Sequence, residues 1–158
     1  MQNLFLILIA IVAVLFIWLM WARQSLIHHL RSFQRRDELL RRDFAKRRDM
    51  VPYLLESFRT RHEWTPQCLD LLERRKAFHL SGKSSMKAEA EFEEVLNAFI
   101  LAYDIRDVNY LDAEKSITAI SEIVERAKQE WKAEHDAFLN LKKRFPYSTA
   151  SAIFGVRI

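Results

Sequence analysis

The chain has 158 residues, a length that suits one domain with a real hydrophobic core and is short for two. Two glycines and three prolines, against many Leu, Ala, Glu, Lys and Arg residues, predict an all-helical protein. The single cysteine, Cys68, excludes an internal disulfide and a metal site built from several cysteines. Its apolar neighbours predict a buried structural residue.

Residues 4–22, LFLILIAIVAVLFIWLMWA, are nineteen consecutive apolar or small residues. As a helix they would reach about 28 Å, close to the ~30 Å hydrocarbon core of a bilayer. Trp18 and Trp21 stand at the end of this run, where indoles prefer the membrane–water boundary. A cleaved signal peptide is disfavoured, because no basic residue precedes the run and no small-residue cleavage site precedes Arg23. The sequence therefore predicts an uncleaved signal-anchor.

Arginines follow the apolar run, and no basic side chain precedes it. Those within about twenty residues of it are Arg23, Arg31, Arg35, Arg36, Arg41 and Arg42. The positive-inside rule then leaves the N-terminus outside and the following domain in the cytoplasm. Residues 23–61 hold eleven Lys and Arg against five Asp and Glu, a net charge of +6, whereas residues 62–158 carry −2. The basic segment predicts contact with anionic lipid headgroups, and nucleic acid is not an expected partner because no binding motif accompanies it.

Apolar residues spaced alternately by three and four predict four helices after the apolar run. The first continues from it without a break and carries a heptad-like, coiled-coil-like stripe as far as Phe58. The second begins at the N-cap Thr65 with Pro66 in the first helical position. The later helices are predicted over 65–81, 86–104 and 113–145, separated by the SGKSS loop at 81–85 and an irregular connection at 104–112.

Short connections between these helices favour antiparallel neighbours. We therefore predict a transmembrane anchor at 4–22, an antiparallel four-helix-like bundle over 23–146 with long first and last helices, and an apolar tail at 147–158. Polar residues on the predicted seams, Asp37, Arg47 and Glu134, would fix the helix register through buried or half-buried pairing. Trp131 and Phe138 are expected to be buried against the first helix.

Motifs for catalysis are missing from the sequence. The Glu-x-x-His pattern of di-iron bundles does not occur, and His62-Glu63 lacks the second histidine of a zinc protease. With glycine at positions 82 and 155 alone, no glycine-rich phosphate loop can form. We therefore expect a non-enzymatic protein without cofactor or metal. A metal-dependent enzyme that uses His62, Glu63 and the pair Glu134-His135 is the less favoured alternative.

The segment KRRDMVPYLLESF at 46–58, followed by His62-Glu63, resembles the LemA family of bacterial membrane-anchored helical proteins. That family has an arginine pair, one variable residue, then Asp-Leu-Ile-Pro-Asn-Leu-Val-Glu and a downstream His-Glu. Aromatic residues seven apart near the C-terminus, and the final Phe-Gly, match the family as well, although its asparagines are absent; the matching residues are Trp131, Phe138, Phe145, Phe154 and Gly155. The resemblance implies an all-helical protein of the bacterial inner membrane.

Pro52 lies inside the first predicted helix, where a proline costs roughly 3 kcal/mol because it lacks an N–H group. It leaves the carbonyl of Arg48 unpaired, and Arg47 or Arg48 is the expected donor to that carbonyl. Two interpretations stay open. The proline shapes the helix, or a partner docks on a charged site that consists of Arg47, Arg48, Asp49, Pro52, His62 and Glu63.

The function predicted from these features is that of a scaffold, adaptor or assembly factor bound to other proteins, with a homo-oligomer left open. The alternative is a membrane-surface organiser whose arginine-rich helix binds anionic lipids.

Overall fold

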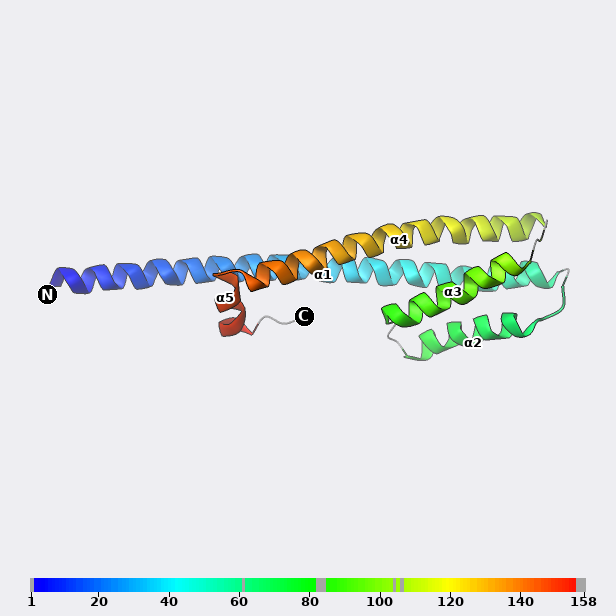
Figure 1. The fold of residues 1–158 in the computed structure, drawn as a ribbon, viewed down its shortest axis with the longest axis horizontal. Helices are drawn as coiled ribbons and strands as arrows, with labels where there is room; N and C mark the ends of the chain where they lie inside the picture. Colours follow the sequence, from blue (N-terminus) through cyan, green and yellow to red (C-terminus); the bar gives the residue numbers. More distant parts are fainter. Residues whose placement is uncertain (1, 61, 82–84, 104, 106, 156–158) are drawn as a thin grey trace. The chain divides into compact units, whose positions relative to one another are not determined.

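The computed structural model describes residues 2–60, 62–81, 85–103, 105 and 107–155. These residues form helices connected by short segments, and the prediction of an all-α fold with long first and last main helices is confirmed. The helices are α1 (Gln2–Arg59), α2 (Pro66–Ser81), α3 (Met86–Ala102), α4 (Val108–Lys143) and α5 (Tyr147–Phe154) (Figure 1).

Side-chain caps set the beginnings of three helices. Thr65 Oγ1 accepts a hydrogen bond from the Cys68 N–H at 3.4 Å, which confirms the predicted start of α2. Ser85 caps α3 in the same way, with 3.1 Å to the Ala88 N–H. The start predicted for the fourth helix was wrong: it begins at Val108 rather than 113, because Asp107 Oδ1 accepts from the backbone N–H groups of the first turn. Of the predicted SGKSS loop, residues 82–84 lie outside the described residues.

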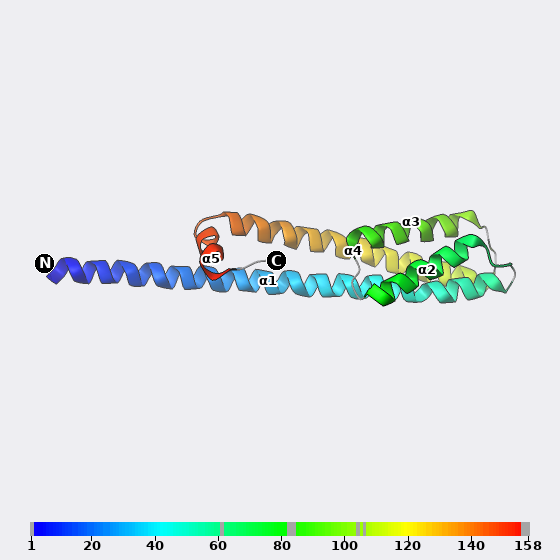
Figure 2. The same cartoon turned by 90° about the horizontal axis from the view of Figure 1, so that it is seen from below.

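The chain divides into two compact units, and α1 and α4 each contribute a segment to both. Unit 1 comprises Met1–Glu38 and Lys128–Ile158, and unit 2 comprises Leu39–Ala127. Within unit 2, segments of α1 and α4 lie beside α2 and α3, and each helix runs opposite to the one before it along the chain (Figures 1 and 2). The domain boundaries predicted at 22 and 146 stay predictions.

Aromatic and aliphatic side chains fill the core of unit 2. The fully buried ones of largest volume are Leu40, Phe44, Leu54, Leu55, Phe58, Leu71, Phe92, Phe99 and Tyr110. Cys68 is fully buried among them, which confirms its predicted burial. The apolar positions at spacings of three and four on α1 and α3 face this core, as their helical periodicity requires.

The core of unit 1 is smaller. Ala22, Leu26, Phe138 and Ala150 are buried there, and the predicted burial of Phe138 is confirmed. The predicted burial of Trp131 was wrong: it is half-buried, because its indole N–H donates to the half-buried Asp37 Oδ1 at 3.1 Å and its ring stacks on the half-buried His135.

The segment predicted as an apolar tail contains helix α5. Its C-cap, Gly155, has φ +64°, a left-handed conformation that glycine adopts without strain, and the Gly155 N–H donates to the Ser151 carbonyl. The described part of that segment is therefore structured.

Among the described helices, α1 is the one that is long and apolar enough to cross a membrane. Its large apolar side chains between Phe5 and Trp18 are left exposed by the rest of the chain, with 67% of Ile17 accessible. Exposure on this scale along a continuous apolar helix is expected where the surrounding medium is lipid.

Candidate functional site

A cluster of charged side chains lies inside unit 2, around the residues that precede Pro52. Arg47 occupies a seam position of α1 and its side chain is fully buried. Arg47 Nη1 approaches Glu93 Oε2 at 3.0 Å, and Nη2 lies 3.8 Å from Glu89 Oε2. None of the three guanidinium nitrogens makes a hydrogen bond among the described residues, so the 3.0 Å contact is an ion pair without hydrogen-bond direction. Burial and charge pairing, as predicted for the seam, are therefore confirmed for Arg47.

Arg48 shares Glu89 with Arg47. Its guanidinium donates to Glu89 Oε1, and the carboxylate of Glu89 is fully buried. Arg48 also covers the ring of Phe78, with 4.5 Å between the guanidinium carbon and the ring centroid, a cation–π contact. Burial lowers the pKa of Arg48, Asp49 opposes that shift, and the positive charges nearby add to it.

The backbone carbonyl that Pro52 leaves without its helical partner has a donor from another helix. Arg75 of α2 donates through Nε to the Arg48 carbonyl oxygen at 3.1 Å, and its Nη2 lies 3.4 Å from Asp49 Oδ1. The prediction that Arg47 or Arg48 would supply this donor was wrong. A side chain attached to the same helix turn has to curl back along the axis to reach this carbonyl, whereas Arg75 approaches it from the side. α1 therefore continues through Pro52 to Arg59.

Charge in this cluster is balanced: three arginines of α1 and α2 face three carboxylates of α1 and α3. The arginines are Arg47, Arg48 and Arg75, and the carboxylates are Asp49, Glu89 and Glu93. Buried ions are tolerated when each charge is compensated, and removal of one partner is expensive. Guanidinium groups paired in this way hold neither a nucleophile nor a proton acceptor near neutral pH. The geometry favours a structural role, in which the cluster holds three helices together.

Comparison with known proteins finds no match for this chain. No protein-family model, no curated protein and no solved structure matches it. The resemblance to the LemA family therefore stays a prediction, and function has to be argued from the described geometry.

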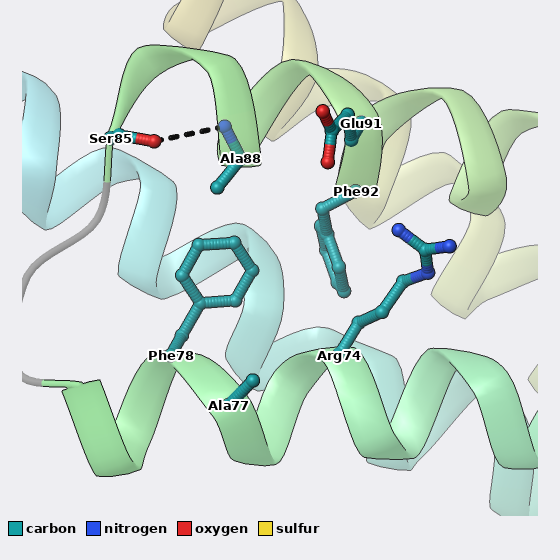
Figure 3. Close-up of a pocket in the computed structure, with 7 residues that line it drawn as sticks. All are labelled: Arg74, Ala77, Phe78, Ser85, Ala88, Glu91 and Phe92. Carbon is teal, nitrogen blue, oxygen red and sulfur yellow. Dashed lines mark hydrogen bonds between the residues drawn. The ribbon is translucent and has the colours of Figure 1, made fainter.

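A pocket of about 280 Å³ lies between α2 and α3 (Figure 3). Its lining consists of Arg74, Ala77, Phe78, Ser85, Ala88, Glu91 and Phe92. The polar groups in this lining have other partners: Ser85 caps α3, Arg74 Nε lies 3.0 Å from both carboxylate oxygens of Asp70, and Glu91 Oε1 lies 3.9 Å from Lys87 Nζ. Ligand sites usually measure about 300–1,000 Å³ and present converging polar groups. The pocket lies between the second half of α2 and the first turns of α3, its lining mixes apolar and polar side chains, and its volume is just below that range.

His62 and Glu63 are exposed and lie just beyond the end of α1, more than ten residues after Asp49 of the charged cluster. The imidazole of His62 stacks on Phe58, with 4.9 Å between ring centroids, and lies 6.4 Å from the Tyr103 ring. The other half of the metal-site alternative, Glu134-His135, belongs to unit 1, where His135 stacks on Trp131. Within the described part of the chain, no three His, Cys, Asp or Glu side chains gather closely enough to hold a metal ion.

The predicted lipid-binding arginines are not equivalent. Arg31, Arg35, Arg41 and Arg42 are exposed. Arg36 pairs with Glu130, and Arg23 covers the ring of Phe154 at 5.2 Å. Exposure leaves the first four accessible to headgroups or to acidic proteins, and Arg36 and Arg23 make their contacts within unit 1.

The sequence did not reveal three members of the cluster that pair with the charges of α1, namely Glu89, Glu93 and Arg75. One signal for Glu89 was present: it precedes Phe92 by three residues and Leu96 by seven, so it occupies the apolar face of α3. A charged residue on such a face requires a buried counter-charge. The seam arginine Arg47 was the natural candidate for that counter-charge.

Proposed function

We propose that the chain is a single-pass protein of the bacterial inner membrane, with its N-terminus outside, residues 4–22 in the bilayer and the α-helical part that follows on the cytoplasmic side. It acts there as a non-enzymatic scaffold, adaptor or assembly factor. The apolar segment of α1 with its exposed side chains supports the anchor, and the six arginines that follow support the orientation. The LemA-like segment at 46–63 belongs to the same proposal.

The observation that carries the scaffold proposal is a set of exposed apolar side chains at one end of unit 2. At this end α1 and α3 finish and α2 and α4 begin (Figures 1 and 2). The set, called here the end surface, consists of Trp64, Leu69, Leu101 and Val108, and Leu101 is 86% exposed. Single exposed apolar residues are ordinary, but several gathered on one end of a small helical unit are typical of a protein-binding surface.

The charged cluster would keep the helices that form the end surface in place. An end surface built from four separate helix ends keeps its shape only if those helices hold their positions, and the ion pairs and hydrogen bond between α1, α2 and α3 hold three of the four together. His62 and Glu63 lie in the connection at this end and would supply a polar rim.

In-cell crosslinking tests the proposal. The crosslinked partners of wild type should be lost in Leu101→Lys and Val108→Lys, and kept in Ile123→Lys, a matched change at an exposed apolar residue in the middle of α4. Asp49→Lys reverses an exposed charge of the cluster and should also keep them. Loss of partners in Asp49→Lys alone would place the docking site at the cluster. An unchanged pattern in every variant would refute the scaffold function at the end surface.

Lipid organisation is the second candidate, and the four exposed arginines of α1 favour it. Binding of anionic headgroups is screened over a Debye length of about 8–10 Å at physiological salt. A fragment covering residues 23–158 should then bind phosphatidylglycerol vesicles at low salt and release them at high salt. Exchange of Arg31 and Arg35 for serine should weaken that binding. Salt-insensitive binding would speak against the arginines as its source.

A further inference from the structure

The C-terminal part of unit 1 contacts α1 where its apolar segment ends. The ring of Phe145 packs edge-on against Trp18, with 5.0 Å between centroids. Tyr147, the first residue of α5, lies 6.2 Å from Trp21 by the same measure. The ring of Phe154, the last residue of α5, lies under the Arg23 guanidinium at 5.2 Å.

These contacts set the depth of α5 relative to the apolar segment of α1. Trp21 and Trp18 precede Arg23, the first charge after the apolar run, by about 3 and 7.5 Å along the helix axis. Tryptophan at such a boundary marks the interface between acyl chains and headgroups. In a bilayer that holds α1, the rings of α5 therefore lie in the same interfacial layer, as the position of α5 beside α1 in Figures 1 and 2 illustrates.

The side chains around this corner suit that layer. Phe145 and Ile153 are 68% and 61% exposed, and α5 carries no charged residue. The last turn of α4 holds Lys142 and Lys143, and Arg144 follows directly before α5 begins. An apolar face flanked by basic residues is the composition of segments that lie in the membrane interface and pair with anionic lipids.

We propose that residues 142–154, the C-terminal corner, form a second membrane contact of this protein, lying in the interface of the leaflet from which α1 emerges. Phe145 and Ile153 enter the boundary of the acyl chains, and the basic residues before them meet the headgroups. The occupant of the exposed apolar face is thus the bilayer that holds α1. The inference rests on the proposed anchor, and it adds that unit 1 is attached at two points, which restricts its tilt and rotation against the membrane.

Depth-dependent fluorescence of the full-length protein tests this contact. Single cysteines are introduced by Ile153→Cys, Gln129→Cys and Ile17→Cys in a Cys68→Ala background and labelled with an environment-sensitive fluorophore. The proteins are reconstituted in vesicles of phosphatidylcholine and phosphatidylglycerol. All three positions are exposed, so labelling should leave the fold intact, which circular dichroism verifies. Gln129 is the matched control, on α4 in the same unit and about 20 Å from the corner along the helix.

The label at Ile153 should be quenched by a nitroxide placed shallowly in the lipid, and should be at least about threefold less accessible to aqueous iodide than the label at Gln129. Equal iodide access at both positions, with lipid quenching at Ile17, would overturn the corner contact and leave the anchor standing. A label at Ile153 shielded from both quenchers would show that protein covers the face, which also overturns the proposal. Absence of lipid quenching at Ile17 would refute the anchor itself, and the corner contact with it.

Discussion

Pro52 and Arg75 are linked through the Arg48 carbonyl, and the coupling between them can be measured. The Arg48 carbonyl receives the Arg75 Nε–H at 3.1 Å, and Pro52, four residues later, has no N–H group to offer it. In Pro52→Ala the new backbone N–H can donate the ordinary i to i−4 helical hydrogen bond to that carbonyl. Removal of the Arg75 side chain should therefore lower the free energy of unfolding in wild type, and lower it much less in Pro52→Ala.

The size of the effect follows from the two contacts of Arg75. A hydrogen bond from a charged donor contributes about 1.5–3 kcal/mol to stability, and the pair with the exposed Asp49 carboxylate adds about 0–1 kcal/mol. Arg75→Met should thus lower the free energy of unfolding of wild type by about 2–3 kcal/mol. In the Pro52→Ala background the carbonyl keeps a donor, so the loss should shrink to about 1 kcal/mol, a coupling of about 1–2 kcal/mol.

Urea unfolding of the full-length protein in detergent micelles, followed by far-UV circular dichroism, gives the four free energies of this cycle. Arg74→Met is the control, because the neighbouring Arg74 pairs with Asp70 on its own helix and should show no coupling to Pro52. If Arg75→Met lowers stability equally in both backgrounds, within about 0.5 kcal/mol, Arg75 does not compensate for the proline and the reasoning fails.

The buried charge and the buried phenol of unit 2 give two more expectations. Glu89→Gln keeps the shape of a fully buried side chain but leaves Arg48 without its carboxylate partner, so urea unfolding should show a loss of stability of about 3–5 kcal/mol. The control Glu91→Gln changes an exposed side chain on the same helix and should cost less than about 0.5 kcal/mol. Similar losses for both variants would contradict burial of the Arg48–Glu89 pair. Burial raises the pKa of Tyr110 to about 12, and its hydroxyl makes no hydrogen bond among the described residues, so Tyr110→Phe should not destabilise the fold at neutral pH. An unfolded tyrosine ionises near pH 10, so the stability that the neutral phenol supports is complete below pH 10 and falls by at most about 3 kcal/mol as the pH rises to 12. Tyr110→Phe should therefore remove this loss of stability between pH 10 and 12, and the control Tyr53→Phe, at an exposed position, should not. Equal alkaline unfolding of both variants would refute the assignment of the loss to Tyr110.

Much of the helical architecture could be predicted because its determinants are local. Apolar spacing of three and four residues marked the helical faces, and the Thr65-Pro66 pair marked the start of α2 within a residue. The start of α4 was missed for a local reason too. Asp107 caps that helix, but its neighbours Ile105 and Val108 gave no helical stripe, so the capping signal was overlooked.

The partners in the charged cluster could not be predicted in this way. The sequence placed Arg47 on a seam, and it is buried there, but Glu89 and Arg75 lie 42 and 28 residues further along the chain. Periodicity tells which face of a helix is buried and says little about which residue of another helix lies opposite, because that depends on the register between helices. For the same reason the donor to the Arg48 carbonyl was sought on α1 and found on α2.

Register is also the physical reason for keeping charges in such a core. The apolar face of α3 repeats at Phe92, Leu96 and Phe99, so a shift by one turn along α1 would still bring apolar side chains against apolar side chains. The same shift would move the buried Glu89 carboxylate about 5.4 Å along the axis. Glu93, one turn further along α3, moves with it, so the two carboxylates no longer match Arg47 and Arg48 and one buried arginine loses its counter-charge. The ion cluster thus penalises registers that the apolar seam alone would tolerate. On this argument, a variant with an apolar cluster would gain stability and lose the defined end surface. Pairwise distances between spin labels on α1 and α3 would then broaden, whereas in wild type they should remain narrow.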